Sequence, residues 1–95
     1  MLAQRAGQLV GMNYFYILQS NLDGECYYGS TSNLQKRRQE HQQGKVNATK
    51  YRRPLKLVYY EAYLTITSAR RRERQVKTSG SARKTLHDRI DISGP

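Results

Sequence analysis

The stretch YFYILQSNLDGECYYG, residues 14–29, contains two runs of β-favouring residues separated by a turn. The first run, Tyr14–Gln19, is rich in aromatic and aliphatic side chains, and the second, Glu25–Gly29, contains a tyrosine pair. Between them, Asn21-Leu22-Asp23-Gly24 offers good turn chemistry for a hairpin. We therefore expect two antiparallel strands whose tyrosines lie close together.

Downstream of this hairpin, the sequence contains one helix signal and then one more strand. Ser32-Asn33-Leu34-Gln35 matches a capping box, so we expect a helix over Asn33–Gln43 that ends at Gly44. Leu57–Tyr63 predicts a third strand. Because it favours β structure on both faces, we expect this strand to be central or covered on both sides.

Two further helices are expected in the C-terminal part of the chain. The first begins at a Thr67 or Ser68 cap and extends to Lys77. After the Ser79-Gly80-Ser81 break, with Ser81 as the cap, the second extends from Ala82 to Ile90. The order strand, strand, helix, strand, helix, helix predicts an α+β domain with a small three-stranded antiparallel sheet flanked by helices.

Length and composition limit the chain to one domain. Ninety-five residues support a single small core. We expect a disordered extension over residues 1–12, the domain over 13–90 and a frayed tail over 91–95. No apolar run is long enough to cross a membrane. Cys26 is the only cysteine, which excludes a disulfide within the chain and fits a cytoplasmic location.

The positive charge is strongly uneven along the chain. The net charge is +10, with Arg5 against Asp23 and Glu25 in residues 1–35, and sixteen basic against five acidic residues in residues 36–95. The two parts therefore carry −1 and +11. A basic protein kept soluble by its charge would show the same total. The asymmetry favours a polyanion partner, and nucleic acid is the natural candidate.

Polar residues also recur at helical spacing where core residues would be expected. Arg37 and His41 are four residues apart, so they lie on one face of the first expected helix. Glu73 follows Ala69 by four residues and precedes Val76 by three, on the stripe that should face the sheet. A carboxylate on that stripe needs either a basic partner or a bound cation.

Taken together, these residues resemble the motifs of the GIY-YIG nuclease family. The likeness is greatest to its small stand-alone members, which look like the N-terminal nuclease domain of an excinuclease. It extends from about Asn13 to Ile90. The matching residues are Tyr16, Tyr27, Gly29, Arg37, His41 and Glu73. The first motif reads Tyr14-Phe15-Tyr16 in place of Gly-Ile-Tyr, and no residue matches the polar residue that many members place after the final helix.

The resemblance implies a metal-dependent DNA endonuclease acting on structured or damaged DNA. It implies one divalent ion, Mg²⁺ or Mn²⁺, on Glu73, and Arg37 as a clamp on the phosphate. Tyr16 or Tyr27 would activate the water, which requires a tyrosine pKa below its ordinary value of about 10. His41 would orient the water or relay its proton.

Phosphate contacts are expected from basic residues of the first and second helices and of the loop between them. These are Lys36, Arg38, Lys45, Lys50, Arg52, Arg53 and Arg70. The alternative is a catalytically silent module of the same fold that binds DNA or RNA, including an RNA-binding or ribosome-associated protein. A partner protein that targets the domain is compatible with either function, and the sequence leaves the oligomeric state open.

Overall fold

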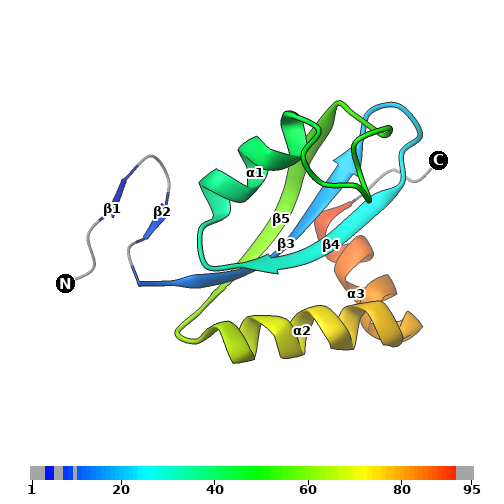
Figure 1. Ribbon diagram of the computed structural model, residues 1–95. Coiled ribbons are helices and arrows are strands. Elements are labelled where there is room, and N and C mark those ends of the chain that lie inside the picture. The colour runs from blue at the N-terminus through cyan, green and yellow to red at the C-terminus, as the bar shows by residue number, and fades with distance from the viewer. Residues whose placement is uncertain (1–3, 6–7, 10, 92–95) are drawn as a thin grey trace.

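A computed structural model describes residues 4–5, 8–9 and 11–91 (Figure 1). The elements are β1 (Gln4–Arg5), β2 (Gln8–Leu9), β3 (Asn13–Ser20), β4 (Cys26–Thr31), α1 (Leu34–Gln42), β5 (Leu55–Tyr63), α2 (Ile66–Thr78) and α3 (Gly80–Ile90). From β3 onward, the order is strand, strand, helix, strand, helix, helix, and the three strands form one antiparallel sheet. This confirms the predicted α+β fold.

The N-terminal segment contains a short pair of strands of its own. In this pair, β1 and β2 are antiparallel, with Gln4 opposite Leu9. Residues 1–3, 6–7, 10 and 92–95 lie outside the described part of the chain, so the extension over 1–12 and the tail over 91–95 stay predictions. No helix in the described ranges has the length and apolar character that a membrane span requires.

The central strand of the sheet is β3, with β4 and β5 on its two sides. Residues 14–20 are all buried, whereas β5 exposes Lys56, Tyr60 and Ala62. A central position for the strand at 57–63 is therefore wrong, and that strand is an edge. Both strands have apolar side chains on both faces, but only β3 has a hydrogen-bonded neighbour on each side.

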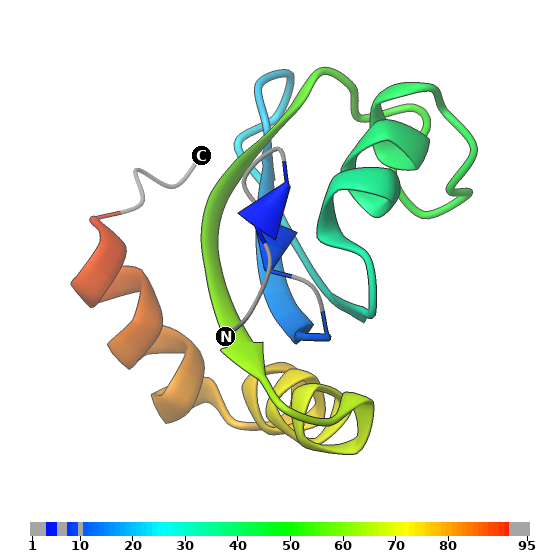
Figure 2. The ribbon, with the colours of Figure 1, turned by 90° about the vertical axis from the view of Figure 1, so that its left-hand side faces the viewer.

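Alternation along β3 sends its side chains into two cores on opposite faces of the sheet. Tyr14, Tyr16 and Leu18 pack with Leu34 of α1, while Phe15 and Ile17 pack with residues of α2 and α3. Figure 2 shows α1 on one side of the sheet and α3 on the other. The same alternation in β4 places Tyr27 with the α1 core and Tyr28 with the other.

The helix ends differ from the predicted ones by one to three residues. Asn33, rather than Ser32, is the cap of α1, and its side chain accepts a hydrogen bond from the Lys36 N–H at 3.1 Å. Thr65 caps α2. Ser79 ends α2 and caps α3, so the predicted break is a sharp corner of one residue. In each case the residue with extended backbone next to the first turn takes the cap.

Candidate active site

The site begins where the ring of Tyr16 lies across the backbone of β4. Tyr16 on β3 is directly opposite Gly29 on β4. A Cβ atom at Gly29 would lie 2.5 Å from the Tyr16 hydroxyl oxygen and 2.6 Å from Cζ. These distances are far below van der Waals contact, so only a glycine at position 29 allows the Tyr16 ring to occupy this position.

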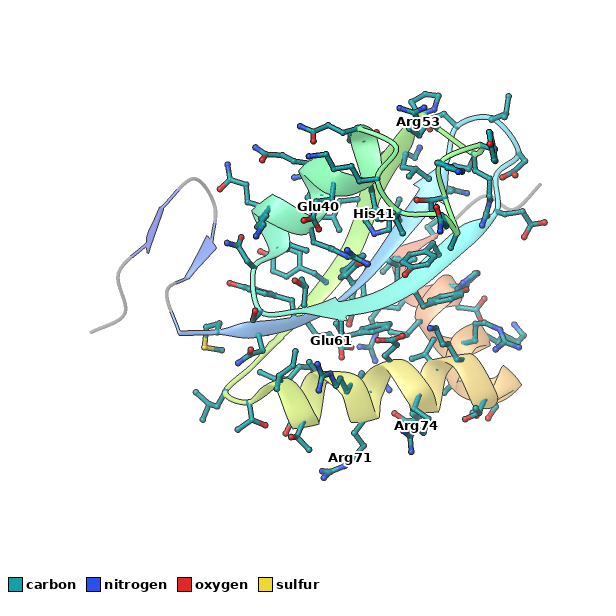
Figure 3. All side chains as sticks on the ribbon, in the orientation of Figure 1. Glu40, His41, Arg53, Glu61, Arg71 and Arg74 are labelled. Carbon is teal, nitrogen blue, oxygen red and sulfur yellow. The ribbon has the colours of Figure 1, made fainter. Side chains whose placement is uncertain are left out.

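A buried hydrogen-bonded chain extends from Tyr16 into α1 and the loop after it. The Tyr16 hydroxyl is 3.0 Å from Nε2 of His41, and Nδ1 of His41 is 2.8 Å from Oγ1 of Thr49. Tyr16, His41 and Thr49 are 1%, 0% and 0% exposed. Figure 3 shows His41 pointing from α1 toward the sheet. The predicted polar face of α1 is therefore real, but its histidine is fully buried.

Arg37 and both ring nitrogens of His41 take part in this chain. The Arg37 guanidinium, which can only donate, is hydrogen-bonded to the Tyr16 hydroxyl. A neutral imidazole donates through one ring nitrogen and accepts through the other. The contacts of His41 with Tyr16 and Thr49 therefore satisfy both of its nitrogens in either tautomer.

Burial sets the ionisation of this chain. Desolvation, followed by the neighbouring Tyr27, raises the pKa of Tyr16 above its ordinary value, and Arg37 only partly opposes this. Desolvation, followed by the charge of Arg37, lowers the pKa of His41 to about 4. At Tyr16, removal from water outweighs the nearby positive charge of Arg37, so the lowering of a tyrosine pKa by a bound metal stays a prediction.

Tyr27 lies beside this chain and is only partly buried. Its ring centroid is 4.9 Å from that of His41 and 6.3 Å from that of Tyr16. The contact of Tyr27 with His41 is edge-on and that with Tyr16 is tilted, and together they fix the three rings relative to one another. Of the two motif tyrosines, Tyr27 is the one that remains accessible to solvent.

Arg37 connects the buried chain to an open groove between α1 and α2. Its Nη1 donates to Oε1 of Glu40 at 3.1 Å. Burial alone would lower the pKa of Arg37, but the hydrogen bonds to Glu40 and Tyr16 raise it above its ordinary value. The groove has a volume of about 490 Å³, and its lining includes Ser30, Asn33, Lys36, Arg37, Glu40 and Arg70.

Glu73 projects from α2 toward β4, next to this groove. Ala69 and Val76 on the same stripe are fully buried, and the Glu73 side chain is 21% exposed. Its Oε1 accepts a hydrogen bond from Ser30 Oγ at 2.6 Å, and its Oε2 pairs with Lys77. The carboxylate lines a hollow of about 390 Å³ together with Ser30 and Arg70. Its basic partner is thus a lysine one turn away, not a neighbouring arginine.

The donor set around Glu73 fits a hard divalent ion that keeps most of its water. No group of three or more His, Cys, Asp or Glu side chains that could hold a metal occurs in the described part of the chain. Mg²⁺, however, is commonly bound through one or two carboxylates plus waters and phosphate oxygens. One partly exposed carboxylate at a basic groove meets that requirement, provided that Lys77 moves aside.

The predicted site residues come from two faces of the sheet. The α1 side holds Tyr16, Tyr27, Arg37 and His41. On the α2 side, Glu73 accepts a hydrogen bond from Ser30 of the edge strand β4. The two groups are close enough for the Glu73 charge to contribute to the raised pKa of Tyr16. The two groups of predicted site residues therefore lie on opposite faces of the edge strand β4, close to each other.

The predicted phosphate-binding residues are divided by the structure. Lys36 and Arg70 line the groove, and Arg38 and Lys45 are exposed.

Three others in the loop already have partners. Lys50 lies over the Tyr51 ring, Arg52 pairs with Asp23, and Arg53 donates to the carbonyls of Lys50 and Gln42. Arg52 and Arg53 thus also hold the loop in place, and their contact with phosphate stays a prediction.

Two residues of the site were missed from the sequence. Thr49 lies in a polar loop without any periodic pattern, and Ser30 follows the recognised motif directly. Thr49 offered no signal in the sequence. Ser30 offered a weak one, because alternation from Tyr28 places it on the face that α2 covers.

Comparison with known proteins agrees with this geometry. Residues 12–86 match the model of the GIY-YIG catalytic domain. The chain is 45% identical over 74 residues to a UPF0213 protein of Syntrophus aciditrophicus, covering 76% of this chain and 84% of that protein. A UPF0213 protein of Bacillus pumilus is 40% identical over 76 residues, covering 79% of this chain and 76% of that protein.

A solved structure shows the same fold. The solution NMR structure of a UPF0213 protein from Bacillus halodurans superimposes with a TM-score of 0.51 at 32% sequence identity, covering 87% of this chain and 86% of that one. The region that matches the family model, residues 12–86, contains all the motif residues singled out above, namely Tyr16, Tyr27, Gly29, Arg37, His41 and Glu73. The chain therefore belongs to the GIY-YIG catalytic domain family, which has a nuclease-type fold.

Proposed function

We propose that this protein is a metal-dependent endonuclease that hydrolyses phosphodiester bonds in DNA. The observation that supports this most is the junction of a buried Tyr16–His41–Thr49 chain with Arg37, at the mouth of a basic groove. A protein that only binds nucleic acid has no need of a neutral histidine hydrogen-bonded to a tyrosine beneath the groove. Such an arrangement fixes Arg37 and the Tyr27 ring in place beside the groove, as the positioning of a reacting phosphate requires.

Arg37 is the proposed clamp on a non-bridging phosphate oxygen. Its Tyr16 and Glu40 hydrogen bonds fix the guanidinium plane at the edge of the groove. The planar fork matches phosphate geometry, and losing such a preorganised donor typically lowers the rate by about 10²–10³. Lys36 and Arg70, on the two sides of the groove, would hold the flanking phosphates.

Glu73 is the proposed ligand of one divalent ion. When bound, Mg²⁺ or Mn²⁺ would act as a Lewis acid that stabilises negative charge on phosphate and on the departing oxygen. The role of the protein is to present one carboxylate oxygen, with the other held by Ser30. Lys77, which is 46% exposed on its side chain, can turn toward solvent to release Oε2.

Tyr27 is the better placed of the two tyrosines to meet the attacking water. Tyr16 is 1% exposed and its pKa is raised, so it serves to hold Arg37 and His41. Tyr27 reaches solvent and contacts the edge of His41. The water oxygen would bond to phosphorus as the P–O3′ bond breaks. Tyr27, in its phenolate form, would take the water proton and later release it to solvent, and the departing oxygen would take a proton from solvent.

The decisive experiment incubates labelled duplex, single-stranded and branched DNA with the protein and Mg²⁺, Mn²⁺ or EDTA. We expect metal-dependent cleavage that Glu73→Ala abolishes. The matched control is Asp88→Ala, which removes an exposed carboxylate from a lysine pair on α3 and should cleave normally. Cleavage that survives in Glu73→Ala would contradict the assignment of the metal ligand.

The same assay separates the two tyrosines. Tyr27→Phe should lower the rate by about 10²–10⁴, the range of general base catalysis, without changing the fold. If Tyr16→Phe lowers the rate and Tyr27→Phe does not, the assignment of Tyr27 is wrong.

One observation favours the alternative of a silent nucleic-acid-binding module. Glu73 is already satisfied by Ser30 and Lys77, so its position needs no metal ion. In that case, every DNA substrate would be bound and none cut, with Mg²⁺ or Mn²⁺ present. Tight RNA binding that is unaffected by Glu73→Ala would give the same answer.

A further inference from the structure

A second basic surface continues from the groove onto the side of α2 that is turned away from the sheet. Thr67, Arg70, Arg71 and Arg74 line a shallow hollow of about 310 Å³, and we call these four residues the outer face of α2. They follow the spacing i, i+3, i+4 and i+7, so they form one stripe of the helix. Figure 3 shows Arg71 and Arg74 pointing away from the sheet.

The arginines of this outer face lack acidic partners. Among residues 4–5, 8–9 and 11–91, no carboxylate is paired with Arg70, Arg71 or Arg74. The other basic residues of α2 differ, since Arg72 binds Glu61 and Lys77 binds Glu73. Unpaired like charges on adjacent turns repel each other and destabilise a helix. An external polyanion would remove that repulsion.

The outer face is continuous with the proposed active site. Arg70 lines the groove between α1 and α2, the hollow that contains Glu73, and the outer hollow. Arg74 lines the latter two. A chain of phosphates that leaves the groove beside Glu73 therefore meets Arg70 and Arg74 first, and Arg71 beyond them.

We infer that the outer face of α2 binds the phosphodiester backbone of a duplex segment that continues from the strand held in the groove. Thr67 and Arg74 are seven positions apart in the helix, or about 10 Å along its axis. Phosphates follow at about 3.4 Å along the axis per strand, so this face spans about three of them. One exposed guanidinium group can donate two parallel hydrogen bonds to two oxygens of the same phosphate. The inference rests on the proposed function in that it takes the polyanion to be nucleic acid.

Arg71 is the residue with which the outer face of α2 can be tested separately from the active site, because it lines neither the groove nor the hollow of Glu73. Duplex DNA binding is measured by fluorescence anisotropy in EDTA, so that nothing is cut, across about 50–200 mM salt. In a plot of log affinity against log salt concentration, Arg71→Ala should make the slope shallower by about 0.9, the value for one phosphate contact. The ratio of wild-type to variant affinity should therefore change about 3.5-fold between the two ends of that salt range. Lys84→Ala, an exposed lysine on α3, is the control with the same change of charge.

Three outcomes decide the inference. A loss of slope in Arg71→Ala and none in Lys84→Ala supports it. Equal slopes for the two variants overturn it, because only the net charge would then matter. Wild-type protein that does not bind duplex DNA also overturns it. If the slopes differ but no substrate is cut with metal present, the binding surface stands and the proposed nuclease activity fails.

If cleavage occurs, its kinetics give a second readout. Arg71 lines neither the groove nor the hollow of Glu73, so Arg71→Ala should raise KM and leave kcat unchanged. A fall in kcat at saturating DNA would instead place Arg71 in the active site and contradict a separate outer surface.

Discussion

Replacing Gly29 with alanine tests the contact on which the site is built. The new Cβ would lie 2.5 Å from the Tyr16 hydroxyl and 2.6 Å from Cζ, so the ring has to move. The ring is 1% exposed and hydrogen-bonded to His41, and therefore has no free space to enter. Overpacking of a core typically lowers the free energy of unfolding by about 1–3 kcal/mol. Replacing a strand glycine by alanine raises it by about 0.5–1 kcal/mol.

Because contacts of 2.5 and 2.6 Å are far below the normal range, the cost of overpacking should lie in the upper half of its range, about 2–3 kcal/mol. We therefore expect Gly29→Ala to lower the free energy of unfolding by about 1–2 kcal/mol in total. In a domain of this size, that shifts Tm down by roughly 4–16 °C, which thermal unfolding followed by circular dichroism can measure. The matched control is Gly80→Ala at the start of α3. A Cβ there meets only Arg83 Nη2, at 3.8 Å, so Tm should stay the same or rise.

A second background checks that the Tyr16 ring is the cause. In Tyr16→Leu the hydroxyl and Cζ atoms are absent, so adding Gly29→Ala should cost nothing further. The two changes are then strongly non-additive. The reasoning is refuted if Gly29→Ala is as stable as Gly80→Ala, or if its cost is unchanged in the Tyr16→Leu background.

Of two further predictions, one concerns the buried His41 and the other the half-buried pair of Arg72 and Glu61. The folded-state pKa of His41, about 4, lies below the ordinary 6.5, so the unfolded chain binds the proton first as the pH falls. His41 should thus reduce stability progressively from pH 6.5 to pH 4 by roughly 2–3 kcal/mol, and His41→Gln should lack this component in denaturant titrations at several pH values. Arg72→Met removes two guanidinium hydrogen bonds from Glu61, which also accepts from Tyr59 and Tyr63. It should cost about 1.5–3 kcal/mol, whereas Lys84→Met, in an exposed pair, should cost under about 0.5 kcal/mol; equal costs would show that Glu61 is not held by Arg72.

The local sequence was sufficient for the elements and for much of the site. Runs of β-favouring residues placed Tyr16 and Tyr27 on strands, and the i, i+4 spacing placed Arg37 and His41 on one face of α1. These features are local, because they depend on residue propensity and on a helical backbone that repeats every 3.6 residues. For the same reason, Glu73 was expected beside the sheet, where Ser30 now binds it.

Tertiary structure decided which groups are removed from water and which neighbours they have. The apolar patterns of β3 and β5 look alike, and only pairing on both sides makes β3 central. Thr49, eight residues from His41 in an irregular loop, becomes its partner only when that loop folds back. Desolvation then raises the pKa of Tyr16 and lowers that of His41, the opposite of what nearby positive charge suggested for the tyrosine. The sequence determines which residues share a face, but the energy of a charge depends on the solvent around it, which only packing controls.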